Sequence, residues 1–374
     1  MNVVELSKQL IQRPSITPDD HGCQDILITL LMDAGFEVID LQHGAVRNFF
    51  AYHGSGQPHL MFAGHTDVVP PGPEAQWRFP PFSATEHQGT LFGRGAADMK
   101  SATAAMTLAA IDFVRQHPKH PGTISFAITS DEEGPAIDGT IKIKEYLQTI
   151  KKIPDYVLVG EASSNERIGD AIKVGRRGSL HGHLIIHGTQ GHIAYPQSAD
   201  NAIHRAAAVI QHLSQITWDP GNADFSPTTL QFHSIQSGVA SNVVPGELTA
   251  SFNMRFGPGT DSATLKNALH QAIKETGCRY TLSVEISAEP FFSGDSTFSH
   301  ICQQAITDQI HITPECNTKG GTSDGRHFAP IGCQIVELGA VNTTIHQINE
   351  QIQIDELRQL QHIYHRIIKL SLNA

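Results

Sequence analysis

The chain has 374 residues, of which 40% are apolar and 17% are charged, and its formal net charge is −11. Because a single hydrophobic core stops growing at roughly 250–300 residues, we expect two domains. The apolar content excludes a disordered chain. The acidic balance argues against a nucleic-acid partner, which would require a basic surface.

Histidine is unusually frequent, with 22 copies against five cysteines. The cysteines are odd in number and widely spaced, so the sequence predicts neither a disulfide framework nor a thiolate zinc site. We recognise no signal peptide and no apolar run of about 20 residues that could cross a membrane. We therefore expect a cytoplasmic protein without a membrane partner, in which a few histidines bind metal.

Helices and strands alternate in the first part of the sequence, which is typical of an α/β domain with a largely parallel sheet. Apolar spacing predicts a first helix that ends before Pro14. Further helices are predicted over 24–34, 98–116 and 139–149, and strands over 36–41, 48–53, 59–65, 123–130 and 155–161.

Near residue 176 the order changes to strand, helix, strand, strand, helix, strand, which is the split βαβ pattern. Helix–strand alternation resumes after Pro290. We therefore predict a discontinuous α/β domain, residues 1–177 and 292–374, interrupted by an α+β domain, residues 178–291. The predicted elements of the second part are strands over 179–188, 228–236, 247–256, 279–287 and 333–338, and helices over 199–216, 261–276, 295–309 and 354–371.

Imidazole and carboxylate groups follow several of the predicted strands, at the sheet edge where α/β proteins bind ligands. Mixed nitrogen and oxygen ligands suit zinc, and two ions bridged by one carboxylate would use five of them. Such a pair of ions can activate water and polarise a carbonyl group. The residues concerned are His65, Asp67, Asp98, Glu132, Glu133, Glu161 and His346.

Taken singly, these residues have ordinary explanations. An aspartate at a helix start, such as Asp98, is usually an N-cap, and Asp67 alone would fit a loop cap. Their convergence favours a metal site. Neighbours such as Glu132 and Glu133 point in different directions, so one can bind metal while the other acts as a general base. The spacing of His65 and Asp67 allows the aspartate to orient the histidine ring.

Five motifs are spread along the chain, and the likeness that they define extends over nearly its whole length: GHTDVVP (64–70), GRGAADMK (93–100), TSDEEGPAIDGT (129–140), VGEAS (159–163) and GGTSDGR (320–326). In type and order they resemble the dinuclear zinc aminoacylase and carboxypeptidase family. The resemblance implies a zinc-peptidase-like catalytic domain with an inserted dimerisation or lid domain. Many relatives have proline after the glutamate of VGEAS, where this chain has Ala162 and Ser163, so the shape of that loop is in question.

The resemblance implies two zinc ions per subunit, with cobalt as a possible substitute metal. His65 and Glu161 would bind one ion. Glu133 and His346 would bind the other, and Asp98 would bridge both.

Three further residues receive roles from the resemblance. Glu132 would be the general base, and Asp67 would support His65. His192, in GTQGHIAYP, matches a histidine that enters the neighbouring subunit's site in homodimeric relatives and stabilises the oxyanion. By composition alone, His192 is an ordinary loop histidine.

The motifs GRRGS (175–179), GTSDGR (321–326) and NTTIHQINE (342–350) resemble members that hydrolyse N-succinyl-LL-2,6-diaminoheptanedioate in lysine biosynthesis. Because arginine binds carboxylates as a bidentate fork, such a substrate calls for a local arginine cluster. Arg177 and Arg326 fit either this cluster or surface salt bridges. The positions that match substrate contacts in relatives are Arg176, Ser179, Tyr195, Asn242, Arg255, Gly321, Thr322 and Asn342.

Other functions stay open. The same metal site would serve N-acetyl-ornithine deacetylation or hydrolysis of another N-acyl amino acid, because only the acyl and amine pockets differ. A non-catalytic binding or dimerisation protein with this fold is an alternative of another class, and we would expect it to lack a ligand or Glu132. A dinucleotide site at GRGAAD is disfavoured, because its glycine spacing differs from GxGxxG.

Overall fold

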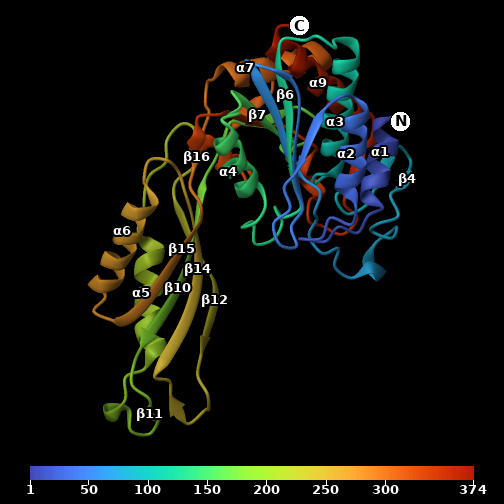
Figure 1. Ribbon diagram of the computed structural model, residues 1–374. Helices are drawn as coiled ribbons and strands as arrows, with labels where there is room; N and C mark the ends of the chain where they lie inside the picture. The colour runs from blue at the N-terminus through green and yellow to red at the C-terminus, as the bar shows by residue number, and fades with distance from the viewer. The chain divides into compact units, whose positions relative to one another are not determined.

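The computed structural model describes all residues from 1 to 374 (Figure 1). The chain forms two compact units. Met1–Gly175, Phe292–Asn317 and Ser323–Ala374 make up the first, and Arg176–Phe291 with Thr318–Thr322 makes up the second. None of the helices combines the length and apolar character that crossing a membrane requires.

The first unit is built on an eight-stranded mixed sheet with the strand order β1-β2-β6-β3-β7-β18-β8-β17. Its centre, β6-β3-β7-β18, is parallel, whereas β1 and β2 add antiparallel pairs at one side. The predicted α/β class with a mixed, largely parallel sheet is confirmed. The strands are β1 (Glu37–Asp40), β2 (Asn48–Ser55), β3 (His59–His65), β6 (Gly122–Thr129), β7 (Tyr156–Val159), β8 (Ala171–Lys173), β17 (Glu315–Asn317) and β18 (Gln334–Glu337).

Helices cover both faces of this sheet. α1, α2, α3, α7 and α9 pack together on one face, and α4 and α8 lie on the other. A small sheet of β4, β5 and β19 was not foreseen. The bounds are α1 (Val3–Ile11), α2 (Cys23–Asp33), α3 (Lys100–Gln116), α4 (Thr140–Ile150), α7 (Thr297–Ile310), α8 (Gly325–Phe328), α9 (Ile354–Leu372), β4 (Thr85–His87), β5 (Thr90–Phe92) and β19 (Gln351–Gln353).

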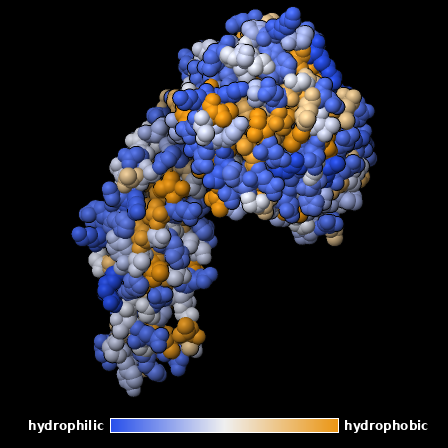
Figure 2. Space-filling view, in the orientation of Figure 1, coloured by the Kyte–Doolittle hydropathy of each residue, from blue (hydrophilic) through white to orange (hydrophobic).

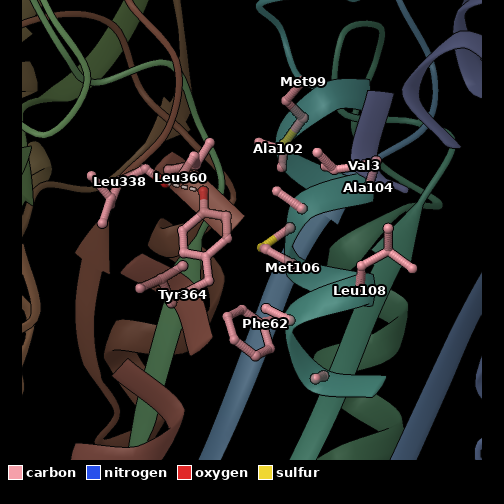
Figure 3. Packing of buried hydrophobic residues seen from close by; sticks show 14 of the residues in the cluster. Val3, Phe62, Met99, Ala102, Ala104, Met106, Leu108, Leu338, Leu360 and Tyr364 are labelled. Atoms are coloured by element: carbon pink, nitrogen blue, oxygen red, sulfur yellow. Dashed lines mark hydrogen bonds between the residues drawn. The ribbon is translucent and has the colours of Figure 1, made fainter. Parts of the chain in front are cut away.

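The main core lies between the sheet and the helices α3 and α9 (Figure 3). α3 is buried along most of its length because many of its residues are alanines, which let the helix approach the sheet closely. Tyr364 of α9 packs edge-on against Phe62 of β3, with ring centroids 5.9 Å apart, and its hydroxyl donates to the carbonyl of Leu338. This packing joins α9 to the middle of β3 and to the residue that follows β18.

The second unit has the predicted split βαβ order and an antiparallel sheet, β12-β14-β10-β15, with α5 and α6 on one face (Figure 1). Its own hydrophobic core lies between the sheet and these helices. The elements are β10 (Gly178–His187), α5 (Ala202–Gln215), β12 (Thr229–Ser237), β14 (Glu247–Phe256), α6 (Ser262–Glu275) and β15 (Arg279–Ala288). The short pairs are β11 (Gly191–His192) with β13 (Val243–Val244), and β9 (Gly175–Arg176) with β16 (Phe291–Phe292).

Candidate dinuclear metal centre

Two histidines and three carboxylates meet at the carboxyl edge of the large sheet. Nε2 of His65 lies 3.4 Å from Asp98 Oδ1 and 3.4 Å from Glu161 Oε1. Nε2 of His346 lies 3.3 Å from Asp98 Oδ2 and 3.0 Å from Glu133 Oε1. The two oxygens of Asp98 thus face two different histidines, as a carboxylate that bridges two metal ions would.

Two glycines bring these ligands together. Gly64 precedes His65, and Gly160 precedes Glu161. A Cβ atom at either glycine would fall well inside van der Waals contact with the methyl group of Met99, the neighbour of Asp98. The strand ends and the start of α3 approach one another because these two positions carry no side chain.

Asp67 holds the turn that carries the adjacent glutamates. Its Oδ2 accepts the backbone N–H groups of Glu132, at 3.2 Å, and Glu133, at 3.1 Å. The ring of His65 is oriented by the backbone of Asp67 rather than by its carboxylate: Nδ1 lies 2.9 Å from the carbonyl oxygen and 3.6 Å from Oδ1. A carbonyl partner keeps the proton on Nδ1, which leaves the Nε2 lone pair for a metal.

The carboxylates of the cluster are buried close to one another, which raises the pKa values of several of its groups. Burial, followed by the charge of Asp98, raises the pKa of Glu161 to about 8. Burial and the charge of Glu161 raise the pKa of Glu132 well above its usual value. The neighbouring carboxylates of Asp98 and Glu133 raise the pKa of His346 to about 10. Nearby cations would relieve this repulsion.

The donor set fits a pair of divalent ions. Ligand atoms of His65, Glu132 and Glu161 lie within 4.8 Å of one another, and so do those of His65, Asp98 and Glu133. The buried atoms Nε2 of His65 and Oδ1 of Asp98 have no hydrogen-bond partner. Buried polar atoms are rarely left unpaired, so their orientation toward a common space favours a metal ligand role.

The backbone of His346 has an unusual conformation for a residue with a side chain. Its φ is +59°, and that of Asn349 in the same loop is +64°. In residues other than glycine, a left-handed backbone conformation is strained and persists only where surrounding contacts hold it in place. Such residues are frequent at functional sites. The side chain of His346 is 50% exposed, so this side of the cluster is open to solvent.

Several expectations change at the level of single residues. Asp98 is not an N-cap, because α3 begins at Lys100 with Met99 in the cap position. The loop after Glu161 is well held despite lacking proline, since Ser163 donates from Oγ to the Ala171 carbonyl at 3.1 Å and accepts the N–H of Gly339 at 3.2 Å.

Two buried charges in the quoted motifs were not predicted from the sequence. Lys100 donates to the carbonyl groups of Leu10, at 3.0 Å, and Arg13, at 2.7 Å, at the end of α1. Glu350, the last residue of NTTIHQINE, is also fully buried. Lys100 could have been recognised as a charge at the start of an alanine-rich run, whereas Glu350 lies in a polar stretch that gave no such signal.

One group of expected substrate contacts lies near the start of β10. Arg176 is buried and donates to the carbonyl of Lys319 at 2.6 Å. Ser179 pairs with Arg255 of β14 across the sheet. Burial, followed by the charge of neighbouring Arg177, lowers the pKa of Arg255.

This group contains buried polar atoms without a partner, namely Nη1 of Arg255 and Oγ1 of Thr322. At Gly320 a Cβ atom would collide with the Arg176 guanidinium, so the turn before Gly321 must lack a side chain. Unpaired donors beside arginines are suited to an anionic ligand.

A second group of expected contacts lies beyond the other end of β10. The N–H of Ile193 donates to the carbonyl of Asn242 at 3.0 Å, and the rings of His192 and Tyr195 are 5.6 Å apart. Nδ1 of His192 accepts the N–H of Ala194 at 3.1 Å, so a neutral ring carries its proton on exposed Nε2.

β10 has 10 residues, so the two groups are separated by about 30 Å of strand. Among the expected contacts, only Asn342 belongs to the first unit, where its N–H donates to the carbonyl of Ser164 at 2.9 Å. Arg326, also in the first unit, donates to the carbonyl of Ser323 at 3.2 Å.

The fold and cluster are those of a metal-dependent hydrolase, and residues 61–370 match the peptidase family M20/M25/M40, to which the chain belongs. The succinyl-diaminopimelate desuccinylase of Coxiella burnetii is 51% identical over 368 residues, 98% of each chain. That of Hahella chejuensis is 47% identical over 367 residues, 98% of this chain and 96% of its own.

Solved structures show the same fold at low identity. An M20 family metallo-carboxypeptidase from Sulfolobus solfataricus has a TM-score of 0.84 at 18% identity and covers 100% of both chains. A dinuclear metal-binding M20 peptidase from Bacillus subtilis has a TM-score of 0.75 at 14% identity, covering 99% of this chain and 98% of its own.

Metal binding should release protons. The pKa values of about 8 for Glu161 and about 10 for His346 mean that both groups hold protons near neutral pH without metal. Because metal competes with these protons, affinity for Zn²⁺ should weaken as the pH falls from about 8 to about 6. Calorimetry in two buffers of different ionisation enthalpy measures the number of protons released and the affinity for Zn²⁺. Binding without proton release, or an affinity independent of pH, would contradict this expectation.

Proposed function

We propose that the protein hydrolyses N-succinyl-LL-2,6-diaminoheptanedioate to succinate and LL-2,6-diaminoheptanedioate, a cytoplasmic step of lysine biosynthesis through diaminopimelate. One observation carries the proposal: the two carboxylate oxygens of Asp98 face two different histidines, His65 and His346, and Glu132 lies in the same cluster. The near full-length similarity to succinyl-diaminopimelate desuccinylases supports the choice of substrate.

We propose zinc as the metal, with cobalt as a substitute. His65 and Glu161 would bind one ion, Glu133 and His346 the other, and Asp98 both. Imidazole and carboxylate ligands suit zinc, and the absence of thiolates from the cluster is compatible with other divalent ions. When bound, two such ions would polarise the amide carbonyl and lower the pKa of a water molecule.

Glu132 is suited to act as the general base. Its backbone N–H is fixed by Asp67, and its raised pKa matches that of a group that accepts a proton and later returns it. Glu132 takes a proton from the attacking water and delivers it to the leaving nitrogen. The exposed Nε2–H of His192 is a suitable donor to the oxyanion that forms.

The arginine cluster near the start of β10 suits the carboxylates of the substrate. Arg176 is fixed by the Lys319 carbonyl, and Arg255 lies beside Ser179 with an unpaired buried Nη1. A guanidinium group binds a carboxylate through two parallel hydrogen bonds. With Gly321, Thr322 and Asn342, these residues would contact the succinyl and diaminopimelate groups.

The separation along β10 supports a homodimer. His192, Tyr195 and Asn242 lie about 30 Å from the arginine cluster, which is too far for one small substrate to contact both groups of a single chain. A second copy can supply the distant group. β12 is an edge strand, and the apolar residues Ile193, Ile203 and Ile235 are exposed in this unit, where Figure 2 shows hydrophobic surface. Exposed apolar patches and free strand edges are typical of interfaces.

A substrate panel tests the proposed activity. With zinc-loaded protein, kcat/KM for N-succinyl-LL-2,6-diaminoheptanedioate should exceed that for N-acetyl-ornithine by at least about 100-fold, because an acetyl group offers no carboxylate to the unpaired buried Nη1 of Arg255. Preference for N-acetyl-ornithine would assign the sibling activity. Binding of two metal ions without hydrolysis of any N-acyl amino acid would favour a non-catalytic role.

Replacement of the base should separate binding from chemistry. Glu132→Gln should retain two zinc ions and lower kcat by at least about 100-fold, because proton transfer is lost while the ligands stay in place. Metal analysis and initial rates on the same preparation measure both effects. Near wild-type turnover would show that another group acts as the base.

Mixed dimers test whether His192 acts across subunits. His192→Ala and Glu132→Gln should each be nearly inactive alone. Co-refolded in equal amounts, they should regain about a quarter of wild-type activity, because half of random dimers are mixed and each holds one complete site. If His192 acts within its own chain, mixing restores nothing. Light scattering on the same samples verifies the dimer.

A further inference from the structure

Glu350 joins the two segments that carry Asp98 and His346. Its Oε1 accepts the N–H groups of Ala97, at 2.8 Å, and Asp98, at 2.9 Å. Its Oε2 accepts the N–H of Gly95 at 3.0 Å and Nη1 of Arg94 at 2.7 Å. One fully buried carboxylate therefore receives four hydrogen bonds, from four different residues of GRGAAD.

Further contacts tie the same two segments together. The backbone carbonyl of Glu350 accepts the N–H of Gly93 at 3.0 Å. Arg94, which is 2% exposed, also donates to the carbonyl of Gln347 at 3.2 Å and lies over the ring of Trp77. The loop from His346 to Glu350 and the segment before α3 thus form one rigid pair. Gln351–Gln353 continues this pairing as β19 beside β5.

The contacts of Glu350 set the distance between Asp98 and His346. Asp98 Oδ2 lies 3.3 Å from His346 Nε2, and both residues belong to the segments that Glu350 joins. The backbone N–H of Asp98 is itself one of the donors to Glu350. A shift of either segment would change the separation of two ligands of the same ion, and metal affinity depends steeply on such placement.

We propose that Glu350 is the positioning residue of the metal centre: its carboxylate holds the backbone of Asp98 so that the bridging carboxylate and His346 meet at one ion. This inference rests on the proposed dinuclear site. It requires a carboxylate, because only a side chain with two acceptor oxygens can receive four donors. Glutamine has the same shape but directs an NH₂ group at two of those donors.

The test compares Glu350→Gln with Asp170→Asn. Asp170 provides a matched control because its carboxylate also accepts three backbone N–H groups, from Asn165, Glu166 and Arg167. Both variants lose acceptors in a loop of the first unit, so both can lose stability. Only Glu350→Gln should alter the metal centre.

Three readouts distinguish positioning from general stability. Glu350→Gln should bind the weaker of two Co²⁺ ions about 10–100-fold less tightly. Its visible Co²⁺ spectrum should change in intensity or wavelength, and kcat should fall about 10–100-fold at saturating metal with KM changed less than about threefold. Asp170→Asn should match the wild type in all three.

A folded Glu350→Gln protein with wild-type metal affinity, cobalt spectrum and kcat would overturn the proposal. If this variant does not fold, Glu350→Asp, which keeps the charge opposite Arg94 but withdraws it by one methylene, decides the question by the same measurements. Failure of the wild-type protein itself to bind two ions would instead overturn the dinuclear site, and with it the proposed function.

Discussion

The accumulation of negative charge in a largely buried cluster is the constraint on which the rest of the structure depends. Asp98, Glu132, Glu133 and Glu161 lie around two histidines, and desolvation opposes the ionisation of Asp98, Glu132 and Glu161. The carboxylates stay close together because the surrounding backbone holds their residues in place against their mutual repulsion. The stability of the fold thus supports a site whose own charges repel one another.

Two buried carboxylates outside the proposed ligand set provide that support in the same way. Asp67 accepts the N–H groups of Glu132 and Glu133, and Glu350 accepts those of Ala97 and Asp98. In each case the carboxylate orients backbone N–H groups, and that of Glu350 also accepts a hydrogen bond from the Arg94 side chain. Ligands carried on a backbone fixed by charge-assisted hydrogen bonds lose little entropy on binding.

The sequence predicted the elements that rest on long, regular patterns. β3 and β6 follow from continuous apolar runs, and the ligands that directly follow strands were found with them. β8 and β17 have three residues each and show no periodicity, so they escaped recognition. The small sheet that pairs β5 with β19 depends on a contact between distant segments, and so does the setting of Glu350. Local pattern contains no information about such contacts.

Gly64 and Gly160 have a consequence for how substitutions at this site are interpreted. Neither can bind an ion or move a proton, yet both leave room for the methyl group of Met99. A single added carbon would have to displace this methyl group, the flexible end of the residue that follows Asp98. A glycine variant that lost activity for this reason would resemble the loss of a ligand in an inactivation screen, although the cause would be crowding rather than chemistry.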